Sequence, residues 1–349
     1  MAPFAGWDMP IQYEGILAEH EWTRRHASIF DTCHMGEFEV EGAQAEEDLE
    51  HLVTQSVSTI KDGQCRYGFL LRDDGGVIDD LTVYRRSNER FFLVVNAGTL
   101  QEDAAWIRSH LSEGTTFTDR SEALAKLDVQ GPSAKAVMES ILGEALPDLG
   151  YFRFTDWHLA DMACTVSRTG YTGEWGYELY FPAQHTERIW QKLTESGEIK
   201  PAGLGARDTL RLEVGYSLYG HELTAEATPV AATRGMFMNM DKDFIGKNAV
   251  LRDMEQGVPR YLAALQLETK RAARAHDKVL CEGRAVGEVT SGALAPSLGV
   301  AVALAYVEAD QCEKGTRLDV EVRGKPLPAT VVDLPFYKDG TARAKSPPQ

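Results

Sequence analysis

The sequence predicts an α+β protein that ends in a separate antiparallel β-barrel. Before about residue 252, stretches whose apolar residues recur at helical spacing alternate with pairs of stretches rich in strand formers, a pattern typical of α+β folds. After residue 260, short apolar stretches follow one another between turns of glycine, proline and charged residues, as in a small barrel. With 349 residues, the chain is long enough for two or three domains.

Composition excludes several classes of function. The net charge of −17 argues against nucleic acid or an anionic membrane as the main partner, because both require clustered Lys and Arg. No apolar run approaches the roughly 20 residues of a membrane span, and residues 1–7 lack the order of a signal peptide, so we expect a cytoplasmic protein. The five cysteines and nine histidines show no metal-ligand spacing, and we expect reduced thiols and no metal.

The first half of the chain predicts helices that alternate with strands. Apolar spacing predicts helices over residues 16–26, 42–54 and 99–111, and another that begins at 131–133. Runs of strand formers predict strands over residues 29–40, 64–71, 116–118 and 124–130.

A hairpin in this half places two aspartates in mid-strand. Residues 73–76 (DDGG) predict a turn before a strand over residues 77–84, and residues 86–89 turn the chain into a second strand over 91–96. Because strand side chains alternate between faces, Asp79 should share a face with Val77, and Asp80 the opposite face with Ile78. The two carboxylates should therefore not form a dyad. Each could still cap a turn or form an ion pair, so the strand pattern alone leaves their roles open.

The second half contains a glycine-rich loop and a short helix with two arginines. Strands are predicted over residues 160–167 and 176–181, on either side of the loop 168–174. A helix should follow over 185–195. In the next helix, Arg207 and Arg211 lie on one side at i,i+4.

The remaining chain predicts the barrel. Its expected strands cover residues 261–267, 284–290, 300–306, 318–322 and 329–332. Residues 252–260, which are charged and contain glycine and proline, form the expected boundary. We therefore predict a first region over residues 1–252, a barrel over 260–338 and a disordered tail over 342–349.

Ten short motifs occur in the order seen in one known family. They are residues 4–10 (FAGWDMP), 30–31 with 34–37 (FD, HMGE), 75–81 (GGVIDDL), 95–97 (VNA), 130–132 (QGP), 168–174 (RTGYTGE), 203–213 (GLGARDTLRLE), 218–220 (LYG), 244–247 (FIGK) and 287–292 (GEVTSG). In these motifs the chain resembles the T-proteins of the glycine cleavage system, which are tetrahydrofolate-dependent aminomethyltransferases. The resemblance covers nearly the whole chain, so it is far more specific than any single motif.

The resemblance implies two interleaved folate-binding subdomains and a C-terminal barrel, arranged around a central cavity for the folate. It also implies a reaction in which the aminomethyl carbon moves from the lipoyl arm of an H-protein to tetrahydrofolate. Ammonia leaves, and the products are 5,10-methylenetetrahydrofolate and reduced lipoyl. Tetrahydrofolate is then the co-substrate, the lipoylated H-protein is the partner, and no metal is required.

The resemblance also assigns roles to individual residues. Asp80 matches the family's acid beside N5 and N10 of the folate, where a carboxylate can orient the ligand and manage its proton. Glu178 matches the residue that binds the pterin, whose edge offers two parallel donors to a carboxylate. Arg207 matches a family arginine in the cavity, where it would bind an anionic tail or carboxylate of the ligand. The alternative interpretation is that Arg207 lies on the helix surface, beside an ion pair between Asp208 and Arg211. The other positions expected to line the cavity are Tyr67, Asn96, Tyr171, Met35, Thr82 and Met236.

One departure from the family bears on the donor of the carbon. Residues 233–238 (TRGMFM) place Met236 where the family commonly has an aromatic residue, and methionine packs against a ring with a less fixed geometry. The alternative is therefore a folate-dependent demethylase of the same fold, acting on a methylated amine, sulfonium or aryl ether. A third possibility, a non-catalytic folate-binding protein, is disfavoured by the presence of Asp80. Dependence on a lipoylated carrier separates the first two, and turnover separates both from the third.

Overall fold

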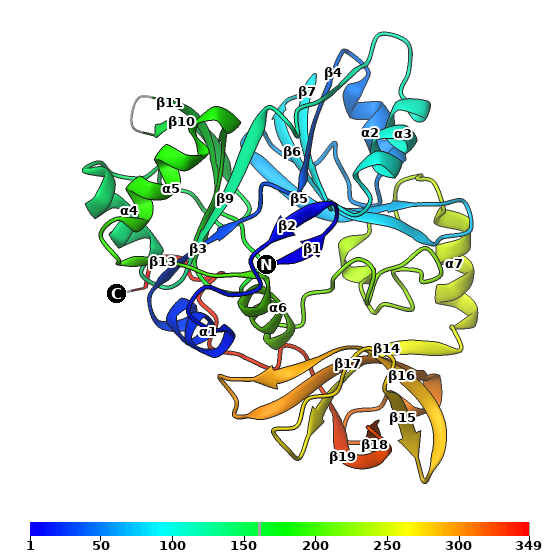
Figure 1. Cartoon of the computed structure of the whole chain (residues 1–349). Helices are drawn as coiled ribbons and strands as arrows, with labels where there is room; N and C mark the ends of the chain where they lie inside the picture. The colour runs from blue at the N-terminus through cyan, green and yellow to red at the C-terminus, as the bar shows by residue number, and fades with distance from the viewer. Residues whose placement is uncertain (160–161, 349) are drawn as a thin grey trace.

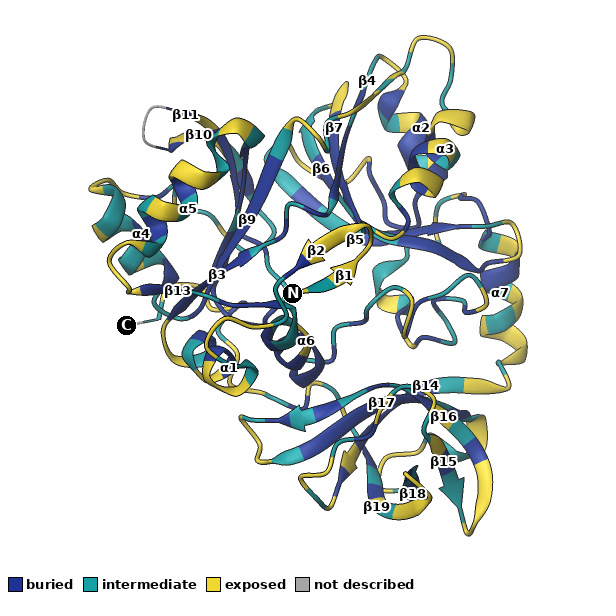
Figure 2. Cartoon of the chain, in the orientation of Figure 1, coloured by how far each residue is buried: buried dark blue, intermediate teal, exposed yellow. Residues whose placement is uncertain are grey.

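The computed structural model describes residues 1–159 and 162–348. Within these residues, two β-sheets lie side by side and a closed β-barrel lies below them in the view of Figure 1. A short hairpin of β1 (Ala2–Phe4) and β2 (Trp7–Met9) lies in the middle of the molecule. Figure 2 shows that buried residues concentrate on the strands, whereas the outer helices expose one side to solvent.

The first sheet has six strands in the order β10-β11-β12-β9-β3-β13. Their bounds are β3 (Ala27–Asp31), β9 (Leu124–Gln130), β10 (Phe154–Leu159), β11 (Met162–Ser167), β12 (Gly176–Pro182) and β13 (Ile199–Pro201). The helices α4 (Ala134–Leu142) and α5 (Thr186–Thr194) pack on its outer face through Met138 and Leu193, which lie in the same core as Leu127 and Leu179 of the strands. These helices leave the other face of the sheet to the interior of the molecule.

The second sheet has five strands in the order β5-β6-β7-β4-β8. Their bounds are β4 (Gly36–Glu41), β5 (Gln64–Leu71), β6 (Val77–Ser87), β7 (Arg90–Val95) and β8 (Thr116–Asp119). The helices α2 (Ala45–Leu52) and α3 (Leu100–His110) cover its outer face, where Leu49 and Ile107 join Leu81 and Val83 in one core. Each sheet therefore has one helix-covered face and one inner face.

The chain interleaves the two sheets. Residues 29–40 were predicted to form one strand. In the structure this stretch is divided into β3 of the six-stranded sheet and β4 of the five-stranded sheet. The prediction was wrong because the apolar pattern continues through both strands, whereas the side chain of Asp31 accepts a bond from the Cys33 N–H and turns the chain out of β3. The chain returns to the first sheet with β9, which pairs with β3.

The inner faces of the sheets meet in a small aromatic core. Tyr84 and Phe92 from the five-stranded sheet pack edge-to-face against Tyr180 from the six-stranded sheet, with ring centroids 5.9 and 5.2 Å apart. The predicted arginine-bearing helix is α6 (Leu204–Glu213), which lies between the first sheet and the barrel. The helix α1 (Ile16–Arg25) packs beside it.

A β-bulge changes the predicted faces of the hairpin strand. Leu70 pairs with Asp79 and Leu71 with Val77, so Ile78 is an extra residue in β6. As a result Ile78 lies in the helix-side core and Val77 in the core on the opposite face, the reverse of the prediction for these two residues. The alternation from Asp79 onward is as predicted, because the bulge precedes it.

The turn before this strand requires its two glycines. Gly75 has a φ of +85°, which side-chain-bearing residues rarely adopt. A Cβ on Gly76 would lie 2.0 Å from the carbonyl oxygen of Ala225. The Gly-Gly pair thus lets the hairpin pack tightly against the segment that leads to the barrel.

The barrel closes in the order β14-β17-β16-β15-β18-β19. Its strands are β14 (Arg260–Leu267), β15 (Lys278–Cys281), β16 (Arg284–Ala295), β17 (Val300–Glu308), β18 (Arg317–Val322) and β19 (Lys325–Val332). The helix α7 (Lys247–Gln256) precedes it, and Leu212 of α6 packs with Leu262 and Leu304 on its outside.

Other sequence predictions also need correction or qualification. The strands β10, β13 and β15 were missed, because polar residues interrupt the first and the other two have only three and four residues. The helix α7 was missed as well, and it extends into the expected boundary over residues 252–260. The predicted strand 160–167 begins with two residues outside the described part, and β11 supplies the rest. Ala342, the first residue of the tail, is buried and donates its N–H to the Gly173 carbonyl. No helix in the described part of the chain is both long and apolar enough to span a membrane.

Candidate active site

The five-stranded sheet holds Asp80 on its inner face. The hydroxyl of Tyr67 donates to Asp80 Oδ2 at 2.9 Å, and Asn96 Nδ2 donates to Asp80 Oδ1 at 2.9 Å. Tyr67 lies on the neighbouring strand β5, and Asn96 directly follows β7. Three predicted site residues are therefore in direct contact.

The surroundings of Asp80 make it an unusually weak acid. Burial disfavours its charged form, the nearby Asp79 carboxylate adds repulsion, and together they raise the pKa of Asp80 to about 7. The bonds from Tyr67 and Asn96 only partly offset this rise. A carboxyl with a pKa near neutral can both accept and return a proton at physiological pH.

The six-stranded sheet holds a different group of charges on its inner face. Lys126 Nζ lies 2.7 Å from both Asp128 Oδ1 and Glu178 Oε1. Lys126 and Asp128 are two residues apart on β9 and so share a face, and Glu178 is on the adjacent strand β12. Burial alone would raise the pKa of Asp128, but the cations Lys126 and Arg207 outweigh it and lower that pKa.

Glu178 is already well supplied with donors. Besides Lys126, the hydroxyls of Thr169, Tyr84 and Tyr180 all donate to its Oε2, the last at 3.1 Å. Its side chain remains 12% exposed, and among the described residues only Lys126 donates to its Oε1. One acceptor position on Oε1 is therefore open to a further donor.

Arg207 faces the interior and not its own helix. Its Nη1 donates to Asp128 Oδ2 at 2.9 Å, and its guanidinium lies over the ring of Tyr171, 4.8 Å from the centroid. Asp208 and Arg211 do pair with each other at 2.8 Å, as the alternative interpretation supposed, but Arg207 takes no part in that pair. Arg207 thereby joins Tyr171 to the charges of the six-stranded sheet.

The two groups of charges adjoin through the tyrosines. Burial raises the pKa of Tyr171, and the charge of Asp80 adds to this rise, which places the two side chains within electrostatic reach. The hydroxyl of Tyr171 donates to the carbonyl of Ser217. Six of the predicted site residues, namely Asp80, Tyr67, Asn96, Glu178, Tyr171 and Arg207, thus belong to one interior region.

The remaining predicted residues take three different positions. Thr82 lies on β6 directly opposite Tyr67, on the face of Asp80. Met35 packs against the aromatic core between the sheets. Met236 lies in the short 3-10 helix η2 (Gly235–Phe237) and is 76% exposed, whereas its neighbour Phe237 packs edge-to-face on Tyr67 at 4.8 Å.

Sequence reasoning missed several members of the site. Lys126, Asp128, Thr169 and Tyr180 were not singled out, although all four contact other site residues. Lys126 and Asp128 carried a usable signal, because two charges at i,i+2 within an apolar strand must share a face and be paired if that face is buried.

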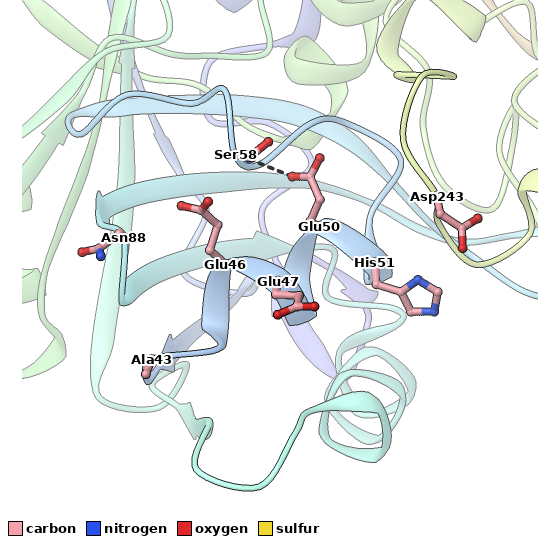
Figure 3. Close-up of a pocket in the computed structure, with 8 residues that line it drawn as sticks. All are labelled: Ala43, Glu46, Glu47, Glu50, His51, Ser58, Asn88 and Asp243. Atoms are coloured by element: carbon pink, nitrogen blue, oxygen red, sulfur yellow. Dashed lines mark hydrogen bonds between the residues drawn. The ribbon is translucent and has the colours of Figure 1, made fainter.

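The surface of the described residues has hollows of different size. A narrow recess beside Arg207, with Met9, Phe30 and Ala202 in its wall, is too small to hold a water molecule. A more open hollow of about 470 Å³ is lined by acidic residues of α2 (Figure 3). There Glu50 accepts bonds from the N–H groups of Val57 and Ser58, so it holds a turn of the chain together.

Fold and site together define the class of the protein. Residues 1–242 match the family model of the GCVT N-terminal domain, and residues 260–338 match that of the glycine cleavage T-protein C-terminal barrel domain. The chain is 44% identical to an aminomethyltransferase of Halalkalibacterium halodurans over 97% of its own length and 94% of the relative's. It is 43% identical to an aminomethyltransferase of Shouchella clausii, over 96% and 93%.

A solved structure agrees with these relatives. The crystal structure of the glycine cleavage system aminomethyltransferase T from Bartonella henselae superposes with a TM-score of 0.92 at 34% identity, covering 97% of this chain and 94% of that one. The chain belongs to the glycine cleavage T-protein family. The resemblance, the α+β fold with its barrel, and the aminomethyltransferase class predicted from the sequence are confirmed.

Proposed function

We propose that this protein transfers the aminomethyl carbon of a lipoylated H-protein to tetrahydrofolate in the cytoplasm, with Asp80 as its acid–base residue. The observation that carries the proposal is the inner-face position of Asp80, held by Tyr67 and Asn96 with a pKa near 7. In the reaction, the carbon forms bonds to N5 and N10 of the folate and loses its bonds to nitrogen and sulfur. The two protons that leave the folate nitrogens end on ammonia and on the lipoyl thiol.

The donor set between the sheets suits a folate. A carboxyl of near-neutral pKa can take a proton from a folate nitrogen and return it to the departing group. Glu178 has an acceptor position open on Oε1, which suits one N–H of the pterin edge. For a second parallel bond, one of the hydroxyls on Oε2 must give way to the ligand.

Arg207 and Met236 complete the proposed site. Arg207 already forms an ion pair with Asp128, so we assign Arg207 to orienting a ligand over Tyr171 and only weakly to attracting an anion. Met236 offers an exposed apolar side chain next to Phe237, which itself packs on Tyr67, and a folate ring can pack on it. Thr82 and Met35 would form part of the wall.

The decisive assay uses tetrahydrofolate and aminomethyl-loaded, lipoylated H-protein, with ammonia and methylenetetrahydrofolate measured together. We expect both products in equal amounts, and neither with H-protein that lacks its lipoyl group. The relatives named aminomethyltransferase favour this donor over a methylated amine, sulfonium or aryl ether. Formation of methylenetetrahydrofolate from one of those compounds, without ammonia from the H-protein, would contradict the proposal.

Folate binding is tested separately at Glu178. Glu178→Gln keeps the shape of the side chain but replaces one acceptor oxygen with a donor. We expect the dissociation constant for tetrahydrofolate to rise by about tenfold to a hundredfold, as for a lost hydrogen bond to a charged group. The exposed Asp156, on β10 of the same sheet, provides the control variant Asp156→Asn. Equal affinity of both variants would show that the pterin binds elsewhere.

A further inference from the structure

The chain that follows the barrel, here called the C-terminal strap (residues 336–344), returns to the glycine-rich loop before β12. It first passes the end of α6, where Tyr337 donates its N–H to the carbonyl of Glu213 at 2.8 Å, and then reaches the six-stranded sheet (Figure 1). Gly340 approaches the loop so closely that a Cβ on it would lie 2.5 Å from the carbonyl oxygen of Gly173. The strap and the loop are therefore packed backbone against backbone.

Thr341 of the strap binds the end of the loop through its hydroxyl. Its Oγ1 accepts the N–H of Trp175, directly after the loop, at 2.8 Å and donates to Glu174 Oε2 at 2.6 Å. Its backbone N–H also donates to this Glu174 oxygen, at 3.2 Å. The other oxygen of Glu174 accepts from Nη1 of Arg24 on α1, at 2.9 Å. Because Glu174 is buried, these donors from the strap and from α1 stabilise its charge.

The next strap residue, Ala342, binds both the beginning and the end of the loop. It donates its N–H to the carbonyl of Gly173 at 3.0 Å, and its own carbonyl accepts from Nη2 of Arg168 at 2.9 Å. The guanidinium of Arg168 lies over the ring of Trp175, 3.3 Å from the centroid, and its Nε and Nη1 have no hydrogen-bond partner among the described residues. Because Arg168 is buried, loss of the Ala342 carbonyl would leave this guanidinium without an acceptor in the described part of the chain.

The middle of the same loop carries contacts of the candidate active site. The hydroxyl of Thr169 donates to Glu178, and the ring of Tyr171 lies against the guanidinium of Arg207. Thr169 and Tyr171 both lie between the two loop positions that bind Ala342. A loop that is held at both ends loses less conformational freedom when a ligand binds, and this favours affinity.

We propose that the C-terminal strap holds the glycine-rich loop in the conformation that binds tetrahydrofolate, with Thr341 as a positioning residue. Its hydrogen bonds fix Thr169 and Tyr171 before the ligand arrives, so the loop need not become ordered during binding. Thr341 acts through the loop and not on the reacting atoms, and it therefore sets the affinity for tetrahydrofolate and not the rate of carbon transfer. This inference rests on the proposed binding of folate beside Glu178 and Tyr171.

The first test compares Thr341→Val with Thr341→Ser. Valine has nearly the same shape as threonine but cannot form the two hydroxyl bonds, whereas serine keeps both. For Thr341→Val we expect the dissociation constant for tetrahydrofolate to rise about tenfold, with kcat at saturating tetrahydrofolate within about twofold of wild type. Thr341→Ser should bind tetrahydrofolate as tightly as wild type. Wild-type affinity in Thr341→Val, or an equal loss in both variants, would overturn the proposal.

Two truncations test the strap as a whole. Deletion of residues 341–349 removes the hydrogen bonds of both Thr341 and Ala342, whereas deletion of residues 345–349 leaves them in place and is the matched control. The dissociation constant for tetrahydrofolate should rise by about tenfold or more in the longer deletion and stay at the wild-type value in the shorter one. Equal affinity of the two truncated proteins would contradict the proposal.

Hydrogen exchange separates the attachment of the loop from the proposed function. In the protein without ligand, the Trp175 amide should exchange about tenfold faster in Thr341→Val than in wild type, and Thr341→Ser should keep its protection. Unchanged exchange in Thr341→Val would overturn the attachment, whether or not folate binds. Absence of tetrahydrofolate binding by the wild-type protein would instead refute the proposed function on which the inference rests.

Discussion

The two sheets bury acidic residues in opposite ways. On β9, Asp128 lies between Lys126 and Arg207, and these cations lower its pKa in spite of burial. On β6, Asp79 and Asp80 have no ion-pair partner among the described residues, and their pKa values are raised. Aspartates at mid-strand thus have a lowered pKa in one sheet and a raised pKa in the other. A nearby cation decides which of the two results.

Loss of a buried charge should lower the free energy of unfolding more in the six-stranded sheet than in the five-stranded sheet. Lys126→Met leaves Glu178 without an ion-pair partner among the described residues and leaves Asp128 paired with Arg207, both inside the protein. We expect a loss of about 3–5 kcal/mol in the free energy of unfolding, measured by urea denaturation at pH 7. Lys135→Met, which breaks a partly exposed i,i+4 pair with Glu139, should cost less than about 1 kcal/mol. Equal losses in the two variants would show that the buried charge of Lys126 matters no more to stability than a partly exposed one.

In the five-stranded sheet, by contrast, loss of a carboxylate should lower turnover and not stability. Asp80→Asn should leave the fold intact, because asparagine fits the same space, but should lower kcat by about a hundredfold or more since the proton acceptor is lost. Steady-state kinetics with loaded H-protein measures this effect. Asp73→Asn, in the exposed turn of the same hairpin, is the matched control. A near-normal rate for Asp80→Asn would show that this carboxyl is only structural.

The pH dependence of stability should have opposite signs in the two sheets. The pKa of Asp103 is raised from 3.8 to about 10, so the unfolded chain ionises first, and Asp103 destabilises the fold increasingly from about pH 4 upward. The pKa of Asp128 is lowered, so its contribution is present above pH 3.8 and is lost as pH falls through its folded pKa. Between pH 5 and 8, Asp103→Asn should therefore gain stability relative to wild type. Over the same range Asp128→Asn should be destabilised, and its loss of stability should shrink only as the pH falls below 3.8.

The smallest effect is expected at Arg207. Arg207→Gln removes one of the two cations at Asp128, but Lys126 remains at 2.7 Å. The expected loss is about 1–2 kcal/mol in the free energy of unfolding, smaller than for Lys126→Met. A loss as large as that of Lys126→Met would mean that Arg207, and not Lys126, balances the buried charge.

Sequence reasoning predicted most of the elements because each has a local signal. The strands β5 and β9 and the helix α3 lie within one residue of their expected bounds, since turn residues or helix spacing mark both ends. The division between β3 and β4 could not be predicted in this way. Their apolar patterns run together, and only pairing with strands far along the chain assigns them to different sheets.

The site could be predicted only in part for the same reason. Asp80 and Arg207 lie within the family motifs, and Glu178 was assigned through the same resemblance. Their partners Lys126 and Asp128 stand outside those motifs, and their importance depends on burial between sheets, which no local pattern encodes. The bulge at Ile78 likewise results from pairing with β5.

The division of residues 27–41 between two sheets also has a consequence for synthesis on the ribosome. Among the described residues, the strand β3 pairs with β9 and β13 alone, which are made roughly 100 and 170 residues later. At about 5–20 residues per second, its apolar side chains Ile29 and Phe30 must wait several seconds or more for a partner. During synthesis the nascent chain therefore passes through a stage in which the five-stranded sheet can form but the six-stranded sheet cannot. At this stage the exposed apolar strand makes the chain most dependent on protection from aggregation.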